Sequence, residues 1–149
     1  MNNYYFFSGK ELPEVASAYT SYSKVSYTDI ISMLEGKTEM PFNFELVKLT
    51  ELDNDLDESK DLSGLKVIWL DYQPNCFAWP IFSEKLKAVI DENLTGNESV
   101  DWLSCNIFGN NEKRTYYVLR FNKLLDVLDF DNTTFVNGTD HIIQPFFQK

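Results

Sequence analysis

The sequence has few of the residues that build metal sites and disulfide frameworks. Among its 149 residues there are two cysteines and one histidine. A zinc site takes four Cys or His ligands, or three with an open position, and these three residues lie far apart in the chain. Cys76 and Cys105 lack the Cys-x-x-Cys spacing and stand in apolar surroundings, so they are expected to be small buried side chains. The sequence therefore predicts no metal and no other cofactor.

Long apolar runs and positive charge are also scarce. No run approaches the ~20 residues that a transmembrane helix requires. The segment Met1–Ser8 has neither the basic region nor the apolar run of a signal peptide, so a cytoplasmic location is expected. The chain has 13 Lys and Arg against 23 Asp and Glu, a formal net charge of −10. Such a field repels nucleic acid and anionic membranes and attracts basic proteins, although acidity also serves solubility alone.

The motifs of known enzyme active sites are missing. The sequence contains no Gly-x-Ser-x-Gly, no glycine-rich phosphate loop and no His-Glu-x-x-His. His141 is the one histidine, and a dyad with either cysteine has no support from spacing. The sequence therefore predicts that the protein is not an enzyme.

One acidic cluster leaves an alternative open. Asp126, Asp129 and Asp131 lie close together in the sequence and could supply a carboxylate pair, with Tyr116 nearby. A small-ligand-binding or hydrolytic domain of this kind would hold a carboxyl of raised pKa in a pocket. Aspartates that flank an apolar stretch more often form its solvated edge, so this function is the second choice.

The hydrophobic content is sufficient for one core. Hydrophobic residues make up 44% of the chain, and twelve Phe, eight Tyr and three Trp supply large side chains. A chain of this length buries roughly two-thirds of its unfolded surface on folding. There are no repeats and no linker composition, so residues 1–149 are expected to form a single domain.

Periodicity favours an α+β fold with a mainly antiparallel sheet and two or three helices. Thr28 is the expected cap of one helix, which Gly36 ends, and Ser83 is the expected cap of a second helix, which Gly96 ends. Glycine and asparagine at 109–111 separate two alternating runs, which predicts a hairpin. Expected strands are Tyr4–Phe7, Phe42–Leu46, a central Lys66–Leu70, Leu103–Ile107, Thr115–Phe121 and a last one with Ile142–Ile143 and Phe146–Phe147, while Leu124–Phe130 fits a helix or an edge strand.

The segment Glu51–Asp61 is the most acidic part of the chain. It carries six acids and one lysine, so a solvated loop is expected. An Asp-x-Asp-x-Asp run begins at Asp53, as in calcium loops. The sixth position, which requires glycine, is Glu58, and the twelfth, which requires a bidentate glutamate, is Gly64. The calcium interpretation therefore fails.

The second half of the chain resembles a known family. A Pro-x-Phe-Ser-Glu-Lys helix start within Trp79–Lys87 precedes Val100–Leu103, a Tyr-Tyr strand at Tyr116–Leu119 and a Leu-Asp motif at Asp126–Asp129. In this order the elements resemble the bacterial immunity proteins of polymorphic toxin systems. The resemblance covers about residues 79–133, little more than a third of the chain.

This resemblance implies a protein that binds a cognate toxin and silences it in the producing cell. It brings no catalytic residues, and a basic nuclease-type toxin domain is the partner that the acidic charge favours. For the acidic residues the alternative is a solvated connection, and for Trp79 it is packing in the core. The expected contact residues are Asp53, Asp55, Asp57, Glu58 and Asp61 in the acidic segment, and the aromatic residues Tyr72, Phe77 and Trp79.

Overall fold

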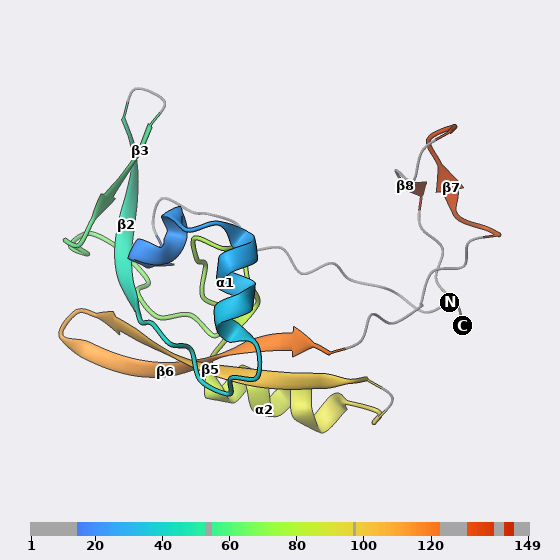
Figure 1. The fold of residues 1–149 in the computed structure, drawn as a ribbon. Coiled ribbons are helices and arrows are strands. Elements are labelled where there is room, and N and C mark those ends of the chain that lie inside the picture. The colour runs from blue at the N-terminus through green and yellow to red at the C-terminus, as the bar shows by residue number, and fades with distance from the viewer. Residues whose placement is uncertain (1–14, 53–54, 97, 123–130, 139–141, 145–149) are drawn as a thin grey trace.

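The computed structural model describes residues 15–52, 55–96, 98–122, 131–138 and 142–144. These residues form an α+β fold in which a curled, mixed sheet lies between helices α1 and α2 (Figure 1). The α+β class predicted from the sequence is confirmed. The elements are β1 (Ser17–Tyr19), the 3-10 helix η1 (Ser21–Lys24), α1 (Tyr27–Leu34), β2 (Phe44–Leu52), β3 (Asp55–Ser59), β4 (Ile81–Phe82), α2 (Glu84–Asn93), β5 (Val100–Gly109), β6 (Glu112–Phe121), β7 (Thr134–Phe135) and β8 (Ile142–Gln144).

The main sheet is mixed, which corrects the expectation of a mainly antiparallel one. Its strand order is β1-β2-β5-β6-β4, with β3 paired to β2, while β7 and β8 form a separate two-stranded sheet. β2 and β5 run parallel, with Phe44 opposite Ile107. They approach closely beside Gly109, where an added Cβ would lie 2.7 Å from Cδ1 of Leu46. The parallel pairing therefore depends on a position without a side chain.

The long β5–β6 hairpin confirms the strongest strand prediction. Its ten residue pairs follow one register and end at Gly109 opposite Glu112. At the turn, Asn110 and Asn111 have φ angles of 50° and 60°, in the left-handed region that asparagine tolerates. Local turn chemistry and alternation thus agree with the observed structure.

Alternation along the hairpin gives each helix its own face of the sheet. One face is buried in the core beneath α1, and the other carries Trp102 and Tyr117 toward α2. On that second face Lys87 of α2 lies over both rings, and Asp91 accepts a hydrogen bond of 2.7 Å from the Trp102 indole. The core face carries Leu103, Cys105, Ile107, Tyr116 and Val118.

The helix starts match the sequence in one case and differ in the other. Ser83 caps α2 as predicted, because its Oγ accepts from the Leu86 N–H at 3.2 Å. α1 is capped by Ser26, and Thr28 lies inside the helix. The Ser26 Oγ accepts from the Asp29 N–H and donates to the Asp29 carboxylate, which fixes the earlier start. Neither described α-helix is long and apolar enough to cross a membrane.

The predicted central strand Lys66–Leu70 is wrong. Only Val67 forms a bridge, with Val15, and the segment has no ladder. The side chain of the fully buried Gln73 binds the backbone in place of a neighbouring strand. Its Oε1 accepts from the Leu70 N–H, and its Nε2 donates to the Ala16 carbonyl at 2.6 Å. The apolar run therefore flanks the core as an irregular segment.

The acidic segment is also different from its prediction as a loop. Residues 51 and 52 end β2, and Asp55–Ser59 pairs antiparallel with β2 as β3. The backbone ladder overrides the low strand preference of acidic side chains. In Figure 1 the β2–β3 hairpin extends away from the main sheet.

Several predicted elements lie outside the described residues, namely Tyr4–Phe7, Leu124–Phe130 and Phe146–Phe147. The strand expected at Ile142–Ile143 is present as β8. The two cysteines are free. Cys105 is buried as predicted, and burial raises the pKa of its thiol to about 12, while Cys76 is half-buried.

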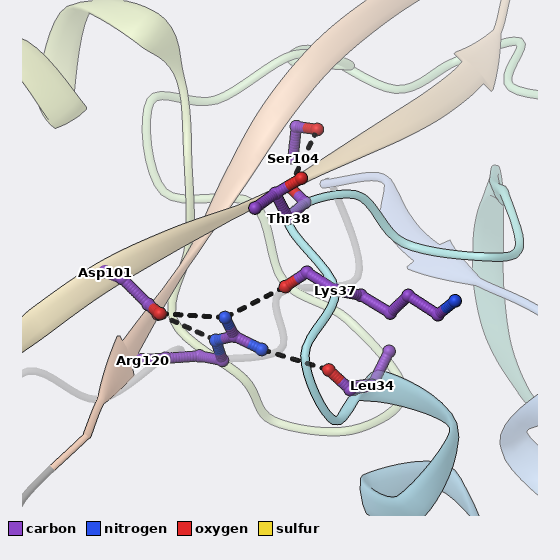
Figure 2. Close-up of polar contacts among 6 residues, drawn as sticks. All are labelled: Leu34, Lys37, Thr38, Asp101, Ser104 and Arg120. Atoms are coloured by element: carbon purple, nitrogen blue, oxygen red, sulfur yellow. Dashed lines mark hydrogen bonds and ion pairs between the residues drawn. The ribbon is translucent and has the colours of Figure 1, made fainter.

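A polar cluster around Arg120 joins the sheet to α1 (Figure 2). The guanidinium of Arg120 on β6 holds the carboxylate of Asp101 on β5 with bonds of 2.7 and 2.8 Å. It also donates to the carbonyls of Leu34, at the end of α1, and Lys37. The last carbonyls of a helix have no partner within the helix, and positive charge is favourable there. One side chain thus fixes two strands and the exit from α1.

Replacing Arg120 by alanine is expected to destabilise the fold by about 2 kcal/mol, because two carbonyls and a carboxylate lose a charged donor. Lys85→Ala is the matched control, since Lys85 pairs with Asp71 at an exposed site and its loss should cost less than about 1 kcal/mol. Urea unfolding of both variants measures the difference. Equal losses would show that the Arg120 cluster adds nothing beyond a surface ion pair.

The same cluster makes stability depend on pH. Hydrogen bonds from Arg120 are the main cause that lowers the pKa of Asp101 from 3.8. A carboxyl with a lowered pKa in the folded state stabilises the fold above its unfolded pKa and loses that contribution as the pH falls through the folded pKa. Asp101→Asn is therefore expected to be less stable than wild type at pH 7, with a difference that narrows below about pH 4. Unfolding curves at both pH values test this, and a constant difference would contradict it.

Candidate functional site

A groove of about 950 Å³ lies between η1, the base of the β2–β3 hairpin and the end of β5. Residues of the stretch 41–47 line it, and three further segments that are distant in the sequence form the rest of its walls. Tyr19 and Tyr22 come from β1 and η1, Glu58 and Lys60 from the end of β3 and the residue after it, and Phe108 from β5. The groove is open and combines aromatic rings with hydroxyl and charged groups.

Aromatic side chains give the groove a firm floor. Tyr22 stacks on the buried Phe42, with ring centroids 4.5 Å apart and planes 16° apart. Phe108 is 39% exposed at the other end, where the Lys113 ammonium lies 5.8 Å from its ring. Partly exposed aromatic rings held by packing are the usual anchors of protein interfaces.

The rim of the groove carries charges of both signs. Lys60 forms an ion pair with Glu45, and both side chains are largely exposed. Lys24 and Glu58 are exposed too, and Glu58 has no ion pair with another described residue. Because Glu45 is already paired with Lys60, Glu58 is the rim carboxylate that a cationic partner can bind without breaking an ion pair of the described residues.

The acidic residues predicted as contacts do not all lie at one place. Asp53 lies outside the described residues, and Asp55 and Asp57 are placed by their backbone in β3. Glu58 lines the groove. Asp61 is exposed and closes a turn, since its carboxylate accepts from the Ser63 N–H at 3.0 Å, and this bond lowers its pKa.

The predicted aromatic contacts do not line the groove. Phe77 and Trp79 are half-buried and stack at 4.4 Å, and Phe77 also meets Phe44 edge-on at 6.1 Å. Tyr72 packs against Phe82 at the sheet edge. Core packing, the alternative interpretation, accounts for Phe77 and Trp79 without a partner, so contact with a partner stays a prediction for these residues.

Asn75 holds this aromatic loop and had no sequence signal beyond its neighbouring proline. Its side chain is almost fully buried. The Oδ1 accepts from the N–H groups of Phe77 and Trp79, and the Nδ2 donates to the Trp79 carbonyl at 2.7 Å. Ala78 between them has a φ of 55°, so the amide of Asn75 stabilises a turn that alanine rarely adopts.

The groove residues Tyr19, Tyr22 and Phe108 were missed by sequence reasoning. Tyr19 and Tyr22 fall in a weakly patterned stretch rich in serine and tyrosine, and Phe108 appears as a strand end. No local pattern relates them, because their segments are brought together by long-range pairing of β2 with β1 and with β5.

The alternative acidic site is only partly described. Asp126, Asp129 and His141 lie outside the described residues, and Asp131 is exposed. Tyr116 is buried and donates its hydroxyl to the Leu70 carbonyl at 2.9 Å, and burial raises its pKa. Within the described ranges no group of three His, Cys, Asp or Glu side chains is placed to hold a metal. The carboxyls with a shifted pKa there are all lowered: Asp61, Asp71, Asp91, Glu98 and Asp101.

Two alanine substitutions should separate core aromatics from groove aromatics. Phe77→Ala removes a ring packed on Phe44 and Trp79 and is expected to cost about 2 kcal/mol of stability. Phe108→Ala removes a partly exposed groove ring and should cost less than about 1 kcal/mol. Thermal and urea unfolding measure both. A larger loss for Phe108→Ala would mean that the groove end is part of the core.

Comparisons of the chain with protein-family models, with curated proteins and with solved structures find no match. The family resemblance carried by residues 79–133 thus receives no independent support from them.

Proposed function

We propose that this protein binds a cognate toxin domain and neutralises it, and that the groove with the adjoining β2–β3 hairpin is the contact surface. The observation that carries the proposal is the position of Glu58. This exposed carboxylate lines an aromatic groove and belongs to the most acidic segment of the chain. Anchoring rings and steering charge therefore meet at one place.

The charge supports a basic partner. With a formal net charge of −10, the protein attracts cationic surfaces over a distance and accelerates their association. The β2–β3 hairpin extends from the sheet (Figure 1), and its backbone carries Asp55 and Asp57 as well as Glu58. Rim carboxylates mainly raise the association rate, while desolvated rings contribute most of the affinity. A basic toxin domain, of which a nuclease is one kind, fits both features.

The geometry also supports a mode of inhibition. The hairpin projects beside the groove, so the surface has a convex and a concave part. Such a surface suits insertion of the hairpin into the cleft of a partner enzyme. A nuclease cleft is lined with cations that bind phosphates. An acidic hairpin placed there would occupy the substrate's electrostatic site, so inhibition would be competitive with nucleic acid.

The test starts from the toxin gene expected next to the gene of this protein. The C-terminal domain of that toxin is expressed in cells with and without this chain, and survival and co-purification are measured. Rescue with a stable one-to-one complex is expected. Continued toxicity together with the absence of a complex would refute the proposed function.

Charge reversal tests the surface once a complex is in hand. Glu58→Lys is expected to weaken binding about tenfold or more and to slow association most at low salt, because it puts a cation on the rim facing a basic partner. Glu92→Lys makes the same charge change at an exposed position of α2, on the other face of the sheet, and should change the affinity less than about threefold. Surface plasmon resonance gives both rates. Equal effects of the two variants would show that the net charge of the protein, and not this surface, determines binding.

A further inference from the structure

The outer edge of β6 offers hydrogen-bonding groups that its neighbouring strand does not reach. β4 pairs Ile81 with Val118 and Phe82 with Tyr117, and the chain then turns into α2 at Ser83. On this side of the sheet, the part of β6 from Glu112 to Tyr116 extends beyond β4.

The register determines which backbone groups face this edge. Leu119 donates its N–H to the Pro80 carbonyl at 3.2 Å, so its backbone groups point to the β4 side. Backbone groups alternate in direction along an antiparallel ladder, and the β5–β6 register is continuous. Lys113 and Thr115 therefore direct their N–H and C=O groups to the same side. Neither forms a backbone hydrogen bond there with another described residue.

A notch of about 430 Å³ lies along this edge. Its walls are the segment from Trp69 to Asp71, the start of α2 from Ser83 to Lys85, and β6 from Arg114 to Tyr116. The notch thus occupies the course that β4 would follow if it continued past Phe82. It has room beside the open backbone groups and is bounded on both sides.

Two side-chain donors at the notch favour an acceptor. The indole Nε1 of Trp69 is buried and has no hydrogen-bond partner in the described part of the chain. The Arg114 guanidinium lies 4.6 Å from the Trp69 ring centroid and uses Nε and Nη2 to hold Glu112. Buried donors without an acceptor are rare, and guanidinium groups bind carboxylates and amide oxygens well.

We propose that an extended segment of a partner protein adds to β6 at this notch as a further strand, with an Asp, Glu or Asn side chain opposite Arg114. Main-chain bonds to Lys113 and Thr115 provide affinity, and the side chain facing Arg114 and Trp69 provides selectivity. The charged residues 112–114 protect the edge from unselective pairing. A second copy of this chain is a poorer occupant, because two molecules of charge −10 repel each other.

This surface is distinct from the proposed toxin-binding groove, which it meets where the Lys113 side chain lies over the Phe108 ring. The groove lies at the β1–β2 side of the sheet and the notch at the β6 side, and none of the residues that line the notch lines the groove. The two surfaces can therefore be tested with separate variants, and failure of one proposal leaves the other standing.

The experiment uses the full chain and a phage-displayed library of random peptides of about ten residues, long enough for one strand. Thr115→Pro removes the outward N–H and leaves the β5 ladder intact, since proline is tolerated where its missing N–H faces away from the sheet. Thr115→Val keeps that N–H and is the matched control. Peptides selected on wild type should carry an Asp, Glu or Asn and bind Thr115→Pro about tenfold or more weakly, with Thr115→Val unchanged.

Amide hydrogen exchange of the wild-type protein gives a second readout that does not depend on any substitution. A bound synthetic peptide should slow exchange at Lys113 and Thr115 and leave the groove residues Tyr22 and Glu58 unchanged. Light scattering of the free chain reports self-association. No enriched peptide, equal binding by both Thr115 variants, protection at other amides, or a dimer protected at this edge would each overturn the proposal.

Discussion

The contact between Arg120 and the end of α1 is the constraint on which the arrangement of the sheet depends. Arg120 joins β6 to Asp101 on β5 and binds carbonyls on both sides of the turn after α1 (Figure 2). The chain leaving this turn is then held against β5, where the Ser104 N–H donates to the Thr38 carbonyl and the Ser104 carbonyl accepts from Met40. This path delivers β2 to β5 in the parallel direction. The guanidinium thus holds the turn from which the chain proceeds into β2.

Both candidate surfaces follow from the way this sheet ends at its two sides. On one side β2 continues past β5 and pairs with β3, so its hairpin leaves the sheet and opens the groove beside Phe108. On the other side β4 is too short for β6, because Ser83 is an effective helix cap and turns the chain into α2. The groove therefore results from the extension of β2 beyond β5, and the notch results from the short length of β4.

The sequence predicted those parts of the fold that local chemistry controls. The β5–β6 hairpin and the Ser83 cap were predicted because turn residues, alternation and capping lie within a few positions of each other. The run Lys66–Leu70 was misassigned because its backbone conformation depends on the long-range contact between Gln73 and Ala16 and not on the run itself. β3 was missed because acidic side chains predict a loop, whereas the strand forms through backbone pairing with β2. Of the residues that line the groove, only Glu58 was predicted, since the aromatic walls meet through long-range strand pairing.

Three reactive side chains of the described residues, those of Cys105, Tyr116 and Asp101, are buried or bonded within the fold. The Cys105 thiol is buried with a pKa raised to about 12, so its thiolate, the nucleophilic form, is scarce near neutral pH. The Tyr116 hydroxyl is held by the Leu70 carbonyl. The Asp101 carboxylate is bound on both oxygens by Arg120. The exposed Glu58 carboxylate and the partly exposed Phe108 ring remain accessible, and such groups suit recognition. A surface that combines them with an acidic hairpin is therefore suited to select a partner by charge and to hold it by packing.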